Sequence, residues 1–222
     1  MNINLEGIKC VLFDLDNTLI DRQMAAYLTY QTIIKRDFPG LEEQEVLKRV
    51  SEIMDWDGEG HADKDFVFNS YIEKYGLHAK TWENYHDLWL VELPKNTIEF
   101  PDSCEVLDYV KRKYRLGLIT NGDFGAQSEK INYTGLAEYF EMILIPSEIG
   151  VQKPDERAFF EACKRMSVNP EECIFVGDGL KTDILGSSSV GMKTIWVHPD
   201  AKRTSDLPWQ RIYRIKDLVE IL

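Results

Sequence analysis

The second half of the chain alternates between short apolar runs and helix-length segments, and this alternation restricts the folds open to it. The apolar runs have the length of buried strands and lie at residues 116–119, 142–145, 174–176 and 194–197. One helical pattern precedes these runs, at residues 103–113, and others lie between them, from 127 to 131, at 155–166 and at 182–189. A short strand and a helix are expected within residues 209–222. Alternation at this spacing is typical of βαβ crossovers, so we expect an α/β fold with a parallel, Rossmann-like sheet.

An earlier apolar run, residues 8–13, predicts the first strand and ends in two acids. Asp14 and Asp16 lie one residue apart after it, and a turn-prone Asn-Thr pair follows them. Ligands of open α/β sheets bind outside the carboxyl ends of the strands. Two crowded carboxylates repel each other unless a cation or a shared proton relieves them. The alternative is a simple turn in which both carboxylates face water, and this pair alone does not decide between the two.

A helical segment interrupts the strand pattern between the first strand and the rest of the sheet. Apolar and aromatic residues recur there at helical spacing, and Gly and Pro divide the segment into four helices. We therefore expect a core of residues 1–20 and 97–222 and a helical domain of residues 21–96. The many aromatic side chains either fill the core of this small domain or offer a stacking surface to a ring-bearing substrate. Trp56 and His61 flank a glycine-bearing loop and are the candidates to reach a substrate, although a surface turn explains them equally well.

Two further strand ends carry polar residues. The run 116–119 continues into Thr120 and Asn121, whose hydroxyl and neighbouring backbone N–H groups could donate to an oxyanion; a turn cap is the alternative for Thr120. Lys153 precedes Pro154, which suits the first position of a helix. A lysine is a poor helix cap but makes sense beside a bound anion. The alternative is an exposed lysine with its ammonium in solvent.

The strand predicted at 174–176 ends in a glycine-rich turn with acids. Gly177 and Gly179 suggest a dinucleotide fingerprint, but its third glycine is missing and Asp178 would repel a pyrophosphate. Asp178 is better placed as a metal ligand. Asp183 could steady Lys153 and the water shell of a metal, or only favour the start of the next helix.

Composition narrows the classes of partner. The 222 residues suffice for one α/β domain with an insertion, and the net charge of −12 argues against nucleic-acid partners. The four cysteines lack C-x-x-C spacing, and we expect reduced, mostly buried thiols of a cytoplasmic protein. Neither a secretion signal nor a membrane-spanning run is evident, so we expect no membrane partner.

Together the strand-end motifs resemble the haloacid dehalogenase (HAD) superfamily. They are D-L-D-N-T, T-N-G, K-P-D and G-D-x-x-x-x-D, in this order. The helical insert resembles the helical C1 cap of that family, and the segment from Gln127 to Lys130 resembles the linker of capped phosphatases. The first motif is similar to that of nucleotidase-like and acylneuraminate-phosphatase-like members. Departures are Gly179, where Ser or Thr is common, and the serines of residues 187–189, where Ala is usual.

The resemblance implies a mechanism for phosphate monoester hydrolysis. Asp14 would attack phosphorus and form an aspartyl-phosphate, and Asp16 would protonate the leaving oxygen and then deprotonate water. Mg²⁺ would lie between Asp14, the backbone carbonyl of Asp16 and Asp178. The phosphoryl oxygens would be bound by Thr120, Asn121 and Lys153. The cap would exclude water and help choose the leaving group.

Several alternatives remain at this stage. Dehalogenases of this layout lack the second acid, so Asp16 favours a phosphatase, but phosphomutases keep both acids. The substrate is expected to be a small phosphate monoester: the aromatic insert suggests nucleoside 5′-monophosphates, and a sugar phosphate is an alternative. A catalytically silent binding or regulatory protein on the same scaffold is the candidate from another class.

Overall fold

The computed structural model describes residues 5–222 and divides the chain into two compact units. One unit, called here the core unit, comprises the chain up to Asp21 together with Glu99–Leu222. The other, called here the helical unit, comprises Arg22–Ile98. The chain therefore leaves the core unit shortly after its first strand and returns just before the helix α5 (Ser103–Lys111).

The core unit contains a six-stranded sheet in the order β3-β2-β1-β4-β5-β6, with every neighbouring pair parallel. The strands are β1 (Cys10–Phe13), β2 (Arg115–Ile119), β3 (Met142–Leu144), β4 (Cys173–Gly177), β5 (Lys193–Val197) and β6 (Gln210–Ile212). The helices of this unit are α5 (Ser103–Lys111), α6 (Phe124–Thr134), α7 (Glu156–Met166) and α8 (Gly186–Ser189). A π-helical turn, η5 (Leu180–Leu185), precedes α8, and a 3₁₀ segment, η6 (Ile215–Glu220), closes the chain. This arrangement confirms the predicted α/β fold.

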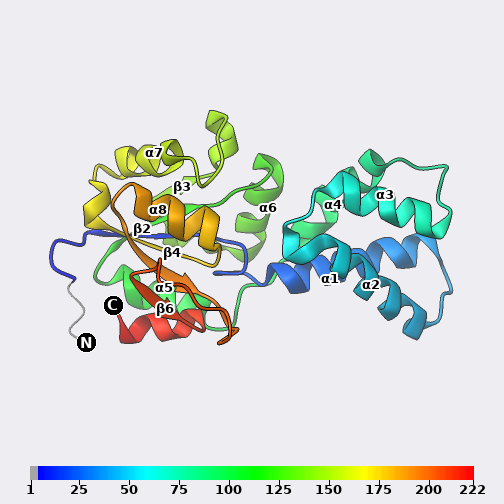
Figure 1. Ribbon diagram of the computed structural model, residues 1–222, viewed down its shortest axis with the longest axis horizontal. Coiled ribbons are helices and arrows are strands. Elements are labelled where there is room, and N and C mark those ends of the chain that lie inside the picture. Colours follow the sequence, from blue (N-terminus) through cyan, green and yellow to red (C-terminus); the bar gives the residue numbers. More distant parts are fainter. Residues whose placement is uncertain (1–4) are drawn as a thin grey trace. The chain divides into compact units, whose positions relative to one another are not determined.

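Both faces of the sheet are covered by apolar side chains, which is why its strands are almost continuously hydrophobic. Alternate residues of β1 point to opposite faces: Val11 and Phe13 pack with α5 and η6, whereas Cys10 and Leu12 pack with α7. Figure 1 shows α7 and α8 on one side of the sheet and α5 with the C-terminal segment on the other. Burial on both faces leaves only the strand ends open to polar chemistry.

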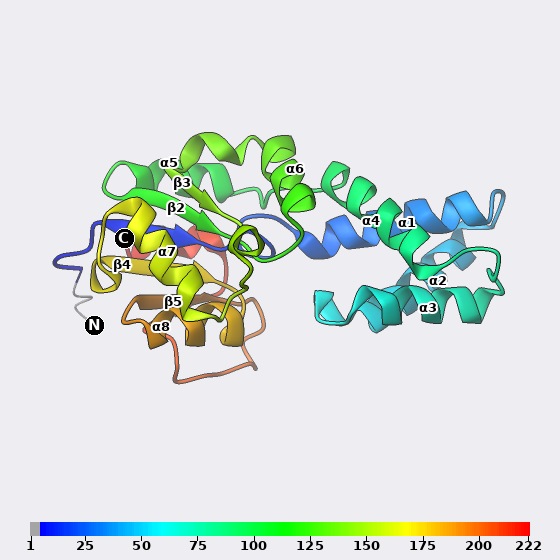
Figure 2. The same ribbon diagram turned by 90° about the horizontal axis from the view of Figure 1, so that it is seen from above.

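The helical unit consists of four α-helices packed on one another (Figure 2). They are α1 (Arg22–Asp37), α2 (Glu43–Asp57), α3 (Lys64–Tyr75) and α4 (Trp82–Lys95). Tyr30, Phe68, Tyr85 and Trp89 form an aromatic core, with the Tyr30 and Trp89 ring centroids 4.6 Å apart. This packing favours the first of the two explanations for the aromatic content, that of side chains filling their own core. Among the described residues, no helix combines the length and apolarity needed to cross a membrane.

Several element boundaries differ from the sequence expectations. The first strand begins at Cys10 rather than Ile8, and α6 begins at Phe124 rather than Gln127 because the Asp123 carboxylate caps it by accepting from the Ala126 N–H. Pro154 precedes the N-cap of α7 instead of opening the helix. The helix expected over residues 182–189 is a π-helical turn followed by the single-turn α8. All four cysteines are free thiols, as expected, and three of them are buried.

Candidate functional site

Three neighbouring strands end at the same edge of the sheet, and each is followed by one of the predicted site residues. β1 lies between β2 and β4, and Phe13 pairs with Leu118 on one side and Val176 on the other. Asp14, Thr120 and Asp178 therefore follow strands whose ends lie level with one another. The Asp14 N–H still donates to the Val176 carbonyl at 2.9 Å, so the first acid is held in the sheet itself.

Asp14 is a buried carboxylate paired with a lysine. It is 6% exposed, and its Oδ1 lies 2.6 Å from the Lys153 ammonium. Burial raises the pKa of Asp14 to about 7, because the opposing effect of Lys153 is partly cancelled by neighbouring acids. The Asp14 carboxylate is thus fixed in position, and its charge is only partly neutralised. This is expected of a carboxylate that binds a cation.

Lys153 is held from both ends. Its ammonium donates to the Ile119 carbonyl at 2.8 Å and forms an ion pair with Asp183 Oδ1 at 2.8 Å, besides its bond to Asp14. Its peptide N–H and carbonyl are both bound by the Asn121 side chain, at 2.8 and 2.9 Å. Burial disfavours the ammonium, but Asp14 and Asp183 outweigh this and raise the pKa of Lys153. The alternative of a solvent-exposed Lys153 is therefore wrong, because the side chain is buried between these two acids.

Asn121 was expected to bind phosphate. Its side-chain amide instead forms hydrogen bonds with the peptide N–H and carbonyl of Lys153. Its contribution to an anion site is thus to fix the backbone that carries the lysine. The other expected donors to an oxyanion were the backbone N–H groups of the turn that Asn121 begins. This turn directly follows Thr120, whose side chain is buried.

Asp178 and Asp183 complete a group of acids around Asp14. One carboxylate oxygen of each of these three residues lies within 4.8 Å of the others. Burial, followed by repulsion from Asp14 and Asp183, raises the pKa of Asp178 to about 8. The Asp183 carboxylate reaches this position because Gly177 has no side chain: a Cβ there would lie 2.5 Å from Asp183 Oδ2. The same oxygen accepts the Gly179 N–H at 2.9 Å, so the two glycines accommodate an acid rather than a dinucleotide.

The three carboxylates suit a divalent cation. When all are ionised, Lys153 alone among the described groups within bonding distance offsets them, which leaves two negative charges uncompensated. Hard oxygen ligands of this kind are those that Mg²⁺ prefers. Asp183, expected only as an outer residue that steadies Lys153, does contact that lysine but also belongs to the carboxylate group itself.

Asp16 lies close in sequence but has different partners. Its two carboxylate oxygens accept from Lys130 Nζ at 2.8 and 2.9 Å, and Oδ2 also accepts from Gln127 Nε2 at 3.0 Å. The residue that follows, Asn17, has a left-handed φ of 58°, a conformation that Asn tolerates. The carboxylate of Asp16 lies outside the group formed by Asp14, Asp178 and Asp183, so only its backbone carbonyl remains as the expected metal contact.

Thr120 is joined to Asp16 through a side chain that sequence reasoning did not assign to the site. Gln127 Nε2 donates to Thr120 Oγ1 at 2.6 Å as well as to Asp16. The sequence offered a signal for this, because Gln127 and Lys130 are polar residues at i, i+3 spacing on one helix face. That spacing does not reveal which face is buried.

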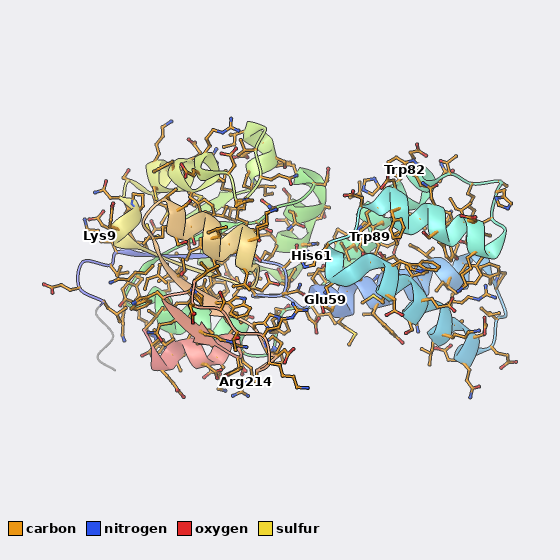
Figure 3. The ribbon with its side chains drawn as sticks, in the orientation of Figure 1. Lys9, Glu59, His61, Trp82, Trp89 and Arg214 are labelled. Carbon is orange, nitrogen blue, oxygen red and sulfur yellow. The ribbon has the colours of Figure 1, made fainter. Side chains whose placement is uncertain are left out.

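The two candidate specificity residues lie in the helical unit. Trp56 is half-buried near the end of α2, with the Lys74 ammonium 5.5 Å from its ring centroid. His61 is exposed and directly follows the glycine-bearing segment Gly58–Gly60. Figure 3 shows His61 and Glu59 on this loop and Trp89 among the helices of the unit. The loop thus presents polar side chains, whereas most of the aromatic rings are turned inward.

Comparisons with known proteins identify a family and similar relatives. The family model for haloacid dehalogenase-like hydrolases matches residues 8–191. The chain is 30% identical to glyceraldehyde 3-phosphate phosphatase of Methanopyrus kandleri, with 97% of each chain covered. It is 29% identical to N-acylneuraminate-9-phosphatase of Mus musculus, with 99% of this chain and 96% of the relative covered.

Solved structures are similar over the same length. A HAD phosphatase from Thermococcus onnurineus shares 26% identity with a TM-score of 0.67, covering 96% of this chain and 97% of its own. The HAD hydrolase YfnB of Bacillus subtilis, solved with magnesium, has a TM-score of 0.80 at 22% identity, covering 97% and 98% of the two chains. The second likeness concerns the fold alone.

Proposed function

The chain belongs to the haloacid dehalogenase-like hydrolases, and we propose that it is a Mg²⁺-dependent phosphatase that hydrolyses small-molecule phosphate monoesters through a phosphoryl group carried on Asp14. The observation that carries this proposal is the buried Asp14, paired with Lys153 and grouped with Asp178 and Asp183. The curated relatives named above act on phosphate monoesters of small molecules, glyceraldehyde 3-phosphate and an N-acylneuraminate 9-phosphate.

In the first half-reaction, an Asp14 carboxylate oxygen attacks phosphorus. A bond forms between that oxygen and phosphorus, and the bond from phosphorus to the leaving oxygen breaks. Asp16 gives a proton to the leaving oxygen, so the alcohol departs neutral. Lys153 and the Thr120 hydroxyl would bind the phosphoryl oxygens as negative charge develops on them.

In the second half-reaction, Asp16 takes a proton from a water molecule that attacks phosphorus. The bond from Asp14 to phosphorus breaks, inorganic phosphate leaves, and both aspartates return to their starting states. Held by Asp14, Asp178 and the Asp16 carbonyl, Mg²⁺ would neutralise charge on the phosphoryl group. Asp183 would hold Lys153 in position throughout.

The test is release of inorganic phosphate from a panel of monoesters, with Mg²⁺ and with a chelator. The panel contains glyceraldehyde 3-phosphate, an N-acylneuraminate 9-phosphate, other sugar phosphates, nucleoside 5′-monophosphates and an aryl phosphate. We expect activity that needs Mg²⁺ and that Asp14→Asn abolishes. Glu129→Gln, an exposed charge removed elsewhere in the core unit, is the matched control and should retain activity. Activity that survives Asp14→Asn would overturn the proposal.

We further propose that the helical unit acts as the cap and selects the leaving group through Trp56 and His61. The exposure of His61 and the half-burial of Trp56 support this role. The inward packing of most other aromatics weakens the case for a stacked base, so the nucleotides serve as the test of that idea. Trp56→Ala and His61→Ala should raise KM for the preferred substrate and leave KM for the aryl phosphate nearly unchanged. Equal effects on both substrates would contradict the assignment.

A further inference from the structure

The inward face of α6 carries two polar side chains that the mechanism above does not use. Gln127 is 3% exposed and Lys130 is 4% exposed, on a helix whose other buried residues include Ala126 and Ile131. Lysine is almost never fully buried unless it is paired, because its ammonium loses the solvation of water. A buried lysine therefore needs an anionic partner, and the identity of that partner indicates what the lysine does.

That partner is Asp16. Lys130 Nζ contacts both carboxylate oxygens, at 2.8 and 2.9 Å, so the ammonium fixes the orientation of the carboxylate as well as its distance. The pair is not an ordinary surface ion pair, since the side chain of Lys130 is 4% exposed and that of Asp16 is 25% exposed. The exposed fraction of Asp16 leaves room for a leaving group on its open side.

Gln127 extends the same network to the phosphate side. Its Nε2 donates to Asp16 Oδ2 at 3.0 Å and to Thr120 Oγ1 at 2.6 Å. Gly122, in the turn before α6, lets the Gln127 side chain lie close to the backbone. It has a φ of 138°, and a Cβ there would lie 3.0 Å from Gln127 Cγ. The Gln127 amide thus links Asp16, the proposed acid and base, to Thr120, the proposed phosphoryl-binding residue.

We propose that Gln127 and Lys130 are positioning residues that hold the Asp16 carboxylate in register with Thr120, so that Asp16 meets the leaving oxygen when phosphorus is bound. The inference rests on the proposed phosphatase function and specifies how its acid is aimed. Its consequence is selective: a misplaced Asp16 harms substrates whose leaving oxygen needs a proton and spares those whose leaving group departs without one.

The experiment compares kcat/KM for an alkyl phosphate and for p-nitrophenyl phosphate, in the wild type and in Lys130→Met. Because kcat/KM reports only the steps up to phosphoryl transfer, hydrolysis of the phosphoenzyme does not obscure the comparison. General acid catalysis contributes about 10²–10⁴-fold, so we expect a loss of about 10²-fold on the alkyl substrate and under about tenfold on the aryl one. Lys130→Arg should recover much of the loss. Glu129→Gln, on the exposed side of the same helix, should lose neither activity.

A double-variant comparison tests whether Lys130 acts through Asp16. In the Asp16→Asn background, adding Lys130→Met should cause little further loss, whereas additive losses would overturn the proposal. Equal losses on the two substrates would overturn it as well. If Lys130→Met does not fold, Gln127→Met carries the same comparison, since it removes the bridge from Asp16 to Thr120 without unpairing a buried charge.

A crystal structure of Gln127→Met or Lys130→Met separates this inference from the proposed function. We expect the Asp16 carboxylate to leave its observed place or to become disordered, while Asp14 and Lys153 stay. An unmoved Asp16 would overturn the inference even if the protein is an active phosphatase. A displaced Asp16 would support the inference about positioning. If the wild type released phosphate from no monoester, this result would contradict the proposed function alone.

Discussion

The core unit and the helical unit each bury a cluster of charged side chains, and the two clusters are balanced in opposite ways. In the helical unit, the fully buried Asp57 accepts from Arg22 Nη1 at 2.6 Å and from the Tyr30 hydroxyl at 2.8 Å, and it also pairs with Lys64. In the core unit, one lysine faces Asp14 and Asp183, with Asp178 close by. In the helical unit two cationic side chains thus pair with one acid, whereas in the core unit a single lysine lies among three acids.

The difference appears in how each carboxyl group responds to its surroundings. Burial alone would raise the pKa of Asp57, but Arg22 and Lys64 outweigh it and lower that pKa to about 2. In the core unit, burial outweighs the effect of Lys153, and the pKa of Asp14 rises to about 7. The first cluster is complete and links the start of α1 to the end of α2. The second is short of positive charge, and we interpret this deficit as the place of a divalent cation.

The largest expected contrast is in the free energy of unfolding. Removing one partner from a buried ion pair typically costs about 3–5 kcal/mol, which we expect for Asp57→Asn. Asp14→Asn should cost less than about 1 kcal/mol or be stabilising, because Lys153 keeps Asp183 as its partner and the substitution removes a buried charge that is poorly neutralised. Urea denaturation measures both. Glu45→Gln, which breaks a partly exposed pair with Arg49, is the control and should cost about 0.5 kcal/mol at most. A larger loss for Asp14→Asn than for Asp57→Asn would reverse the comparison.

Metal addition should sharpen the contrast further. A ligand that binds only the folded state at about 100 times its Kd adds about 2.7 kcal/mol of stability, and we expect an effect of this order from saturating Mg²⁺. The stabilisation should disappear in Asp178→Asn, because one of the three carboxylates is lost. It should persist in Lys64→Met, which alters only the cluster of the helical unit. Thermal melting with and without Mg²⁺ decides this, and an equal shift in wild type and Asp178→Asn would contradict the assigned metal site.

The pH dependence of stability should have opposite signs for the two clusters. The pKa values of Asp14 and Asp178, about 7 and about 8, lie above the ordinary aspartate value of 3.8, so the folded state binds more protons than the unfolded state between these limits. Metal-free protein should therefore lose stability as the pH rises from about 4 toward 8, because folding then requires the uptake of protons, which becomes less favourable as the pH rises. For Asp57 the folded pKa is lowered, so its contribution is present above the unfolded pKa and is lost as the pH falls through about 2.

Urea denaturation from pH 4 to pH 8, in chelator and in Mg²⁺, tests this sign. We expect a falling curve in chelator and a flatter one in Mg²⁺, since the cation binds the ionised carboxylates and therefore stabilises the protein most at the higher pH values. Asp14→Asn should also flatten the curve in chelator. A metal-free protein whose stability rises steadily with pH over this range would refute the account of the core cluster.

The sequence predicted the sheet and its polar strand ends because both depend on local patterns. The apolar runs indicated buried strands, and the acids and the hydroxyl that follow them pointed to one site by their order and spacing, although each alone could have belonged to a turn. It could not predict the partners of Asp16, because the contact with Lys130 spans 114 residues and depends on which face of α6 turns inward. The start of that helix was also missed, since Asp123 was not identified as its cap.

The position of Asp183 was only half predicted. A contact with Lys153 was one of the two interpretations of this residue, and the structure contains it. Its place beside Asp14 and Asp178 depends on the π-helical turn η5 and on the missing side chain of Gly177, and neither has a clear signal in the sequence. Propensity rules describe regular helices, so a turn of this kind falls outside them.

The central claim, that Asp14 carries the phosphoryl group, can be tested by chemical trapping. The enzyme is mixed with Mg²⁺ and a substrate found in the panel, quenched in acid during turnover and reduced with borohydride, which converts an aspartyl-phosphate to homoserine. Peptide mapping should then find homoserine at position 14, and none in Asp14→Asn. Trapping at a different residue, or rapid phosphate release with position 14 never modified, would contradict the account.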